Sequence, residues 1–274
     1  MKRVVLFFSF LSYFQLAQSQ SLEFGFLAGV SIYNGDLSSE EYVRYTEDFL
    51  PAGGIFLRGV VHPKLAVRGS FIIGALRADD KGRTNDVRGL NFKSPLVELS
   101  VVGEIHPFRN RRNMQAPSLS PYFFGGVAGY YFNPKTDYEG EEVELQPIGT
   151  EGQGLPGGPE KYSRVQVSIP LGFGLHWQVN NRLSLGAEFG ARKLFTDYLD
   201  DVGSEEVNYG ILVSNSGTIA GELSIRNPDS RPTETTNSTY SRGKDLLDWY
   251  YIGGITLAFR IQNGGSGQFG CPGF

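Results

Sequence analysis

The sequence has 274 residues, of which 40% are hydrophobic and 13% aromatic, and 36 are glycine. Its 25 Lys and Arg residues against 29 Asp and Glu residues give a net charge of −4, which argues against a nucleic-acid-binding protein. Cys271 is the single cysteine, so no internal disulfide framework holds the fold. The charge balance thus predicts no nucleic-acid partner. Composition does not identify the fold, so the fold has to be inferred from the order of residues along the chain.

The N-terminal segment has the pattern of a secretory signal peptide. Lys2 and Arg3 precede an apolar run at 4–16, and the small-x-small sequence at 17–19 follows. This order of charge, apolar run and small residues predicts export, and the run is too short for a membrane-spanning helix. The expected division is a signal peptide at 1–19, a β-barrel at 20–262 and a flexible C-terminal tail at 263–274.

Eight later segments place apolar residues at every second position, which is the pattern of a strand with two different faces. In 165–179, for example, Val167 and Leu171 alternate with Ser168 and Gly172. Charged, glycine-rich or polar stretches between the segments predict turns and loops, the longest at 194–246. The predicted strands cover 22–33, 52–61, 65–73, 91–105, 121–132, 165–179, 183–191 and 248–261.

The connections alternate between long and short, as in outer-membrane barrels, and each segment is long enough to cross a membrane at a tilt. Aromatic residues at both ends of 121–132 have the spacing of two girdles around an apolar band. We predict an all-β fold, an eight-stranded antiparallel up-and-down transmembrane β-barrel with long extracellular loops. It would be integral to the outer membrane, in contact with lipid, with both termini in the periplasm. The alternative is an exported soluble β-sandwich or lipocalin-like barrel with its charges in solvent.

The polar faces of these strands carry four acids and four bases. In a membrane barrel they point inward, and an eight-stranded barrel is just wide enough for side chains to fill it. Unpaired buried charge is costly, so we expect a lumen charge network that closes the interior rather than a pore. Its predicted members are Glu23, Arg58, Arg68, Glu98, Glu104, Glu188, Arg192 and Arg260.

Catalytic and cofactor motifs are absent from the sequence. It contains no GxSxG, HExxH or phosphate-loop signature, and its three histidines have no metal-ligand spacing. We place His62 and His106 beside turns and His176 in the lumen. The chain is therefore expected to be no enzyme and to need no cofactor. A lipid-modifying enzyme, which would need an exposed Ser with a His partner, is the minor alternative.

Two charged groups remain as candidate sites. Asp197, Asp200 and Asp201 are candidate calcium ligands through their carboxylate oxygens, and the alternative is that they cap the end of a strand. The turn at 106–120 carries three basic residues that would dock a periplasmic partner or an anionic surface, against the alternative of solvated charge. These three residues are Arg109, Arg111 and Arg112.

Three stretches resemble one family. They are YFNPK at 131–135 with LQPIGTEGQG at 145–154, the block at 161–202 that contains FTDYLDD, and GVSIYNGDL at 29–37. Together they resemble the PorG-like outer-membrane barrels of Bacteroidota, a family largely of unknown function and without defined catalytic residues. The resemblance implies an eight-stranded integral barrel. In the named member it implies type IX secretion, with the barrel as anchor for a periplasmic ring built from a lipoprotein and its partner.

The predicted function is therefore a non-enzymatic outer-membrane barrel that anchors or organises a periplasmic assembly of the type IX secretion machinery. Its predicted partner is the periplasmic secretion-ring lipoprotein. The alternative is a small outer-membrane barrel with a surface or ligand-binding role, exercised through its long loops and unrelated to secretion.

Overall fold

The computed structural model describes residues 21–38, 48–81, 86–109, 117–233, 238–244 and 247–261. The predicted signal peptide and the C-terminal tail lie outside these residues. Within the described ranges, no helix is long and apolar enough to span a membrane.

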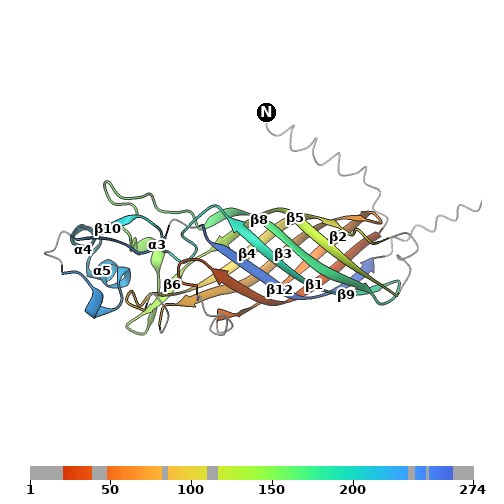
Figure 1. The fold of residues 1–274 in the computed structure, drawn as a ribbon, viewed down its shortest axis with the longest axis horizontal. Helices are drawn as coiled ribbons and strands as arrows, with labels where there is room; N and C mark the ends of the chain where they lie inside the picture. Colours follow the sequence, from red (N-terminus) through yellow and green to blue (C-terminus); the bar gives the residue numbers. More distant parts are fainter. Residues whose placement is uncertain are drawn as a thin grey trace, which may run out of the picture.

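Eight long strands form the wall of a cylinder (Figure 1). Each strand pairs antiparallel with its neighbours, and β3–β4 and β1–β12 pairing closes the sheet. The prediction of a closed eight-stranded antiparallel barrel is confirmed, and closure leaves no unpaired strand edge to face lipid. The strands are β1 (Ser21–Asn34), β2 (Leu50–His62), β3 (Leu65–Asp79), β4 (Asn91–Ile105), β5 (Ser118–Phe132), β8 (Val165–Gln178), β9 (Leu183–Leu194) and β12 (Trp249–Ile261).

The two faces of the wall have opposite character. On the outside, Val167 is 63% exposed, Leu171 50% and Phe189 39%. On the inside, charged residues such as Glu98 and Arg192 are buried. Apolar residues therefore face outward and charges face inward, which contradicts the soluble alternative and is the arrangement of a membrane barrel.

The height of the apolar surface fits a bilayer. On β3 the outward residues from Leu65 to Ala75 are apolar or glycine, and so are their partners on β4 from Ile105 to Pro95. A strand that rises about 3.4 Å per residue and tilts by about 40° covers about 26 Å over this run. The apolar band of outer-membrane barrels is about 25 Å tall, so this surface is tall enough to cross the membrane.

One strand boundary was predicted wrongly, and the terminal aromatics of β5 divide between the two faces of the wall. β3 continues to Asp79 instead of ending at residue 73, because the alternation carries on through the charged residues after the apolar run. In β5, only Phe123 and Tyr131 among the terminal aromatics face outward. Alternation turns their neighbours inward, where they fill the lumen; these are Tyr122, Phe124, Tyr130 and Phe132.

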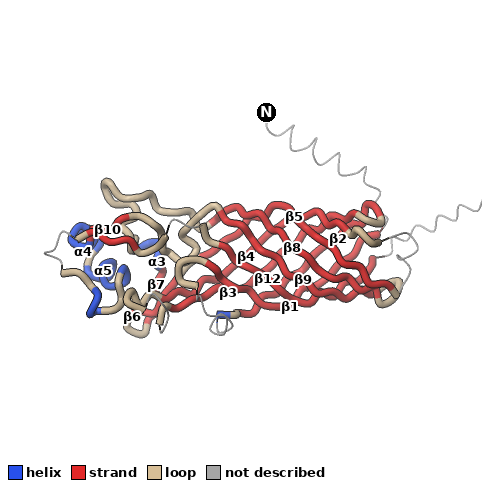
Figure 2. The backbone as a smooth tube through the Cα atoms, in the orientation of Figure 1, coloured by secondary structure: helices blue, strands red, loops and turns tan. Residues whose placement is uncertain are grey.

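One end of the barrel carries a folded cap (Figure 2). We predicted loops here, and the structure instead shows short elements packed on one another, with β6 extending the wall through its pairing with β4. At the opposite end, where β1 begins and β12 ends, short turns join β2 to β3 and β8 to β9. The cap contains β6 (Lys135–Tyr138), β7 (Glu141–Glu144), α3 (Leu145–Ile148), β10 (Glu206–Asn208), α4 (Tyr209–Ser216), α5 (Thr218–Ser224), the 3-10 helix η4 (Pro228–Ser230) and β11 (Thr239–Ser241).

Candidate functional site

Five strands contribute to one ion-pair cluster inside the barrel. Arg58 lies 3.3 Å from Glu23 and 2.8 Å from Glu104, measured between guanidinium nitrogen and carboxylate oxygen. Arg68 lies 3.0 Å from Glu104 and 2.5 Å from Glu188. All five side chains are buried, so each charge depends on its neighbours for compensation. β1, β2, β3, β4 and β9 are therefore joined through the lumen as well as through the wall.

A second ion pair lies nearer the cap. Arg192 Nε is 3.0 Å from a carboxylate oxygen of Glu98, and the Tyr250 hydroxyl donates to the same carboxylate at 2.8 Å. Arg260 completes the set at the other end, 3.4 Å from Glu23 and less buried than the rest. The structure thus places all eight predicted lumen residues in ion pairs within the barrel.

Sequence reasoning missed the neutral partners of these charges. The Tyr122 hydroxyl donates to Glu188 at 2.6 Å, and His176 Nε2 lies 3.8 Å from Glu23. His106, which we placed beside a turn, is fully buried, with its ring 5.9 Å from that of His176. The alternation marks Tyr122 and His176 as inward, but only closure of the barrel shows which charge each one meets.

A serine, a histidine and a glutamate line up in this region. Ser120 Oγ is 3.5 Å from His106 Nδ1, and His106 Nε2 is 3.3 Å from Glu104. The order matches that of a nucleophile, a base and an orienting carboxylate. All three are at most 4% exposed, and two arginines already occupy Glu104. Substrate has no access to these side chains, so the geometry gives no support for catalysis.

The prediction that Arg109 is part of an exposed docking turn was wrong. Its side chain is 1% exposed, because the backbone turns back through a hydrogen bond from Arg109 N–H to the carbonyl of His106. The guanidinium interacts with Glu23 at the mouth of the lumen. Arg111 and Arg112 lie outside the described residues.

The three candidate calcium ligands do not form a cation site in the described part of the chain. Asp200 accepts from the Tyr33 hydroxyl at 2.6 Å, and Asp201 accepts from the Tyr162 hydroxyl at 2.7 Å. Among the described residues, no group of three or more Asp, Glu, His or Cys side chains could hold a metal ion, and this covers any group that would contain Asp197. The two buried carboxylates instead connect the cap to the barrel rim.

A buried polar network holds the cap together. Glu151 accepts from the Gly203 N–H at 2.9 Å and lies 3.4 Å from Arg242, which donates to the Asp201 carbonyl at 3.1 Å. Burial, which outweighs the nearby Arg242 charge, raises the pKa of Glu151 to about 8. The 145–154 and 161–202 stretches, which carry the family resemblance, also meet here through a hydrogen bond from Thr150 to Asp201, and no pattern in the sequence predicts this contact.

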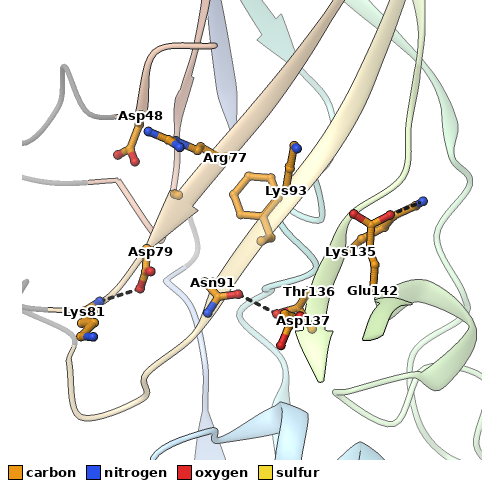
Figure 3. Close-up of a pocket in the computed structure, with 12 residues that line it drawn as sticks. Asp48, Arg77, Asp79, Lys81, Asn91, Lys93, Lys135, Thr136, Asp137 and Glu142 are labelled. Atoms are coloured by element: carbon orange, nitrogen blue, oxygen red, sulfur yellow. Dashed lines mark hydrogen bonds and ion pairs between the residues drawn. The ribbon is translucent and has the colours of Figure 1, made fainter. Parts of the chain in front are cut away.

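A cavity of about 630 Å³ opens where the outer wall meets the cap (Figure 3). Charged residues from the ends of β3 and β4 and from β6 line it, among them Arg77, Lys93 and Lys135. The size is that of a small-molecule site, and the lining is polar and of mixed charge.

Residues 2–222 match the family model described as a domain of unknown function, DUF6089. The chain matches no curated protein. Among solved structures it is similar to Pseudomonas aeruginosa OprG (9% identity, 90% of this chain and 99% of that chain covered, TM-score 0.43). It is also similar to Yersinia pestis Ail (10% identity, 88% of this chain and 98% of that chain covered, TM-score 0.41). A third similar structure is the P. aeruginosa OprF barrel domain (10% identity, 89% of this chain and 100% of that chain covered, TM-score 0.38). At such low identity and TM-score these similarities carry no argument about function.

Proposed function

The chain belongs to the DUF6089 family, and we propose that it acts as a non-catalytic outer-membrane anchor for a periplasmic assembly of the type IX secretion machinery. The observation that supports this proposal is the filled lumen. Ion pairs and aromatic rings occupy the barrel from Glu23 to Tyr250, so the described part of the interior offers neither a pore nor an accessible catalytic group. The two ends and the outer wall remain for function.

The proposed orientation puts the cap outside the cell and the short turns, with both termini, in the periplasm. It rests on the asymmetry of outer-membrane barrels, in which long connections are extracellular. The assignment to type IX secretion rests on the family resemblance carried by 131–154 and 161–202. In this arrangement a periplasmic ring lipoprotein would meet the short-turn end.

The β4–β5 connection remains the candidate docking turn, through Arg111 and Arg112. We expect the double charge reversal Arg111→Glu and Arg112→Glu to reduce recovery of the ring lipoprotein severalfold, because the substitutions replace two positive charges with two negative ones. The measurement is a crosslinking pull-down from solubilised outer membranes. Arg182→Glu, in the exposed turn between β8 and β9, is the matched control and should leave recovery unchanged.

Two outcomes would contradict the proposal. Recovery that is equal for the double variant and the parent would remove this turn as the docking surface. If the parent protein captures no periplasmic lipoprotein, and deleting its gene leaves secretion intact, the anchor function is wrong.

The folded cap favours a second candidate, a ligand-binding barrel unrelated to secretion. A cap with buried polar contacts and a cavity at its base is more structure than an anchor requires. Shortening the β9–β12 connection separates the two functions. An anchor should still recover its partner after this change, whereas a cap-dependent binder should lose its activity with the cap.

A further inference from the structure

A second cavity lies within the cap, between the loop that follows α3 and the junction of α4 with α5 (Figure 1). Its volume is about 410 Å³, which is the size of a small-molecule site. It shares no lining residue with the cavity of mixed charge where the wall meets the cap. The two cavities therefore have to be considered as separate candidate sites.

Much of the wall of this cap cavity is apolar. Val143 of β7, Ile148 of α3 and Leu155 of the following loop are half-buried there. Ile219 of α5 lines the cavity and is 46% exposed, and Tyr138 of β6 adds its ring. An apolar ligand body that enters this space would remove these side chains from water, which favours binding.

Among the described residues, one cation and no acid line the cap cavity. Lys161 Nζ donates to the Pro147 carbonyl at 2.9 Å, and Lys161 forms no ion pair with a described residue. The carboxylate of Glu222, which accepts from the Tyr138 hydroxyl at 2.7 Å, is already compensated by Arg231 at 3.3 Å. An ammonium group has three N–H donors, so Lys161 keeps both charge and donors for an anion.

Gln153 brings an unpaired donor to the same wall. Its side chain is 3% exposed, and its Oε1 accepts from the Glu151 N–H at 2.9 Å, which fixes the orientation of the amide. Its Nε2 has no acceptor among the described residues. A buried N–H group without an acceptor is costly, so an oxygen supplied by a ligand would stabilise this loop.

The loop backbone brings these two donors to one side of the cavity. Gly152 and Gly154, on either side of Gln153, have φ angles of 77° and 84°, which are left-handed values suited to tight turns. Lys161 Cε lies 3.1 Å from the point where a Cβ of Gly154 would stand, so the lysine stem crosses the chain directly beside Gln153. The cavity thus combines an apolar wall with a charged donor and a neutral donor.

We propose that the cap cavity binds a small molecule in which a carboxylate is attached to an apolar body. Lys161 supplies the positive charge and Gln153 a second donor, while Ile148, Leu155 and Ile219 cover the apolar part. Charge-assisted hydrogen bonds are roughly twice as strong as neutral ones, so this wall selects a carboxylate over a neutral oxygen. A ligand in the cap goes beyond the anchor function and rests on the second candidate function, a cap-dependent binder.

The experiment is a ligand-observed NMR titration of the full-length protein in nanodiscs, with empty nanodiscs measured in parallel. The probes are phenylpropanoate, phenylpropanol and phenylpropylamine. We expect the carboxylate to bind at least about tenfold more tightly than the alcohol, because the charge-assisted hydrogen bonds are lost, and the amine not to bind. An acetylated dipeptide that ends in phenylalanine carries the same groups. The tighter of the two carboxylates identifies a free acid or a peptide terminus as the source.

Two variants test the two donors. Lys161→Met keeps the stem beside Gly154 but removes the charge, and it should weaken binding of phenylpropanoate by about tenfold. Gln153→Glu keeps an acceptor for the Glu151 N–H but replaces the donor with an anionic oxygen, so binding should fall below detection. Lys244→Met is the matched control, because this exposed lysine does not line the cavity.

Equal affinity for the alcohol, unchanged affinity of Lys161→Met, or an equal loss with Lys244→Met would each overturn the proposal. Amide hydrogen exchange verifies that the cap stays folded in each variant, and Lys161→Met still tests the site if Gln153→Glu disturbs the loop. Recovery of the periplasmic lipoprotein is measured on the same variants. It should not change, so failure of ligand binding and failure of the anchor function give different results.

Discussion

Glu104 is a single buried carboxylate that compensates the charge of more than one basic side chain. Its carboxylate lies within 3.3 Å of Arg58, Arg68 and His106 in a space closed to water. Removing one partner from a buried ion cluster leaves the others without compensation, and the loss then exceeds what the pair contributed.

Glu104→Gln should therefore lower the free energy of unfolding by about 3–5 kcal/mol, because both guanidinium groups stay buried with less negative charge. The measurement is urea unfolding of the barrel in detergent or vesicles. Glu142→Gln removes an acid from an exposed pair and serves as the control, with no measurable change expected. A shift that is equal in the two variants would show that the lumen cluster adds nothing beyond ordinary surface charge.

At this scale the sequence predicts the direction of side chains but not their contacts. Alternation is enough to send Glu23, Arg58 and Glu188 inward, because a strand has only two faces. Which acid meets which base depends on register and closure across strands far apart in the chain. For Arg109 the alternation had already ended, and a local turn directed its side chain into the lumen.

Among elements, the wall and the cap differ in how far the sequence predicts them. The wall strands were found to within a few residues, apart from the late end of β3, because period two extends over each of them. The cap elements have three to eight residues, and α4 shows almost no amphipathic periodicity. Contacts between these elements, such as the hydrogen bond from the Tyr138 hydroxyl to Glu222, determine their structure. No local sequence pattern predicts such contacts.

The cap should loosen as pH rises. Burial raises the pKa of Glu151 to about 8, and the pKa of Asp201 is raised for the same reason. A carboxyl whose pKa is higher in the folded state binds its proton more tightly there. Such a carboxyl contributes its full stabilisation at a pH below its pKa in the unfolded state. That stabilisation is lost as the pH rises through its pKa in the folded state.

We therefore expect amide hydrogen exchange in the cap, corrected for intrinsic rates, to accelerate from pH 6 to pH 9 while the wall stays protected. Glu151→Gln should reduce this dependence, because the amide cannot ionise. An acceleration that is the same in the variant would assign the effect to other groups, and an acceleration at low pH would show that the sign is wrong.

The whole molecule is a filled cylinder with different ends. The ion pairs of β1 to β4 and β9, together with inward rings such as Phe132 and Tyr130, fill the described lumen with buried side chains. We expect no stepwise conductance when the protein is inserted into planar bilayers at 1 M salt. Reproducible ohmic steps from the parent protein, absent from a mock preparation, would contradict a filled lumen and the anchor function derived from it.

The shared lumen cluster also bears on how the protein is inserted. Before β1 meets β12, Glu23 lacks its partner Arg260 and Arg68 lacks its partner Glu188 across the lumen, and a half-built sheet would carry these charges bare against hydrocarbon. Partial intermediates in the bilayer are therefore costly, and β-strand addition in the insertion machinery has to finish before release. Biogenesis of this barrel should be all-or-none, with incomplete chains retained by their chaperones and degraded rather than lodged in the membrane.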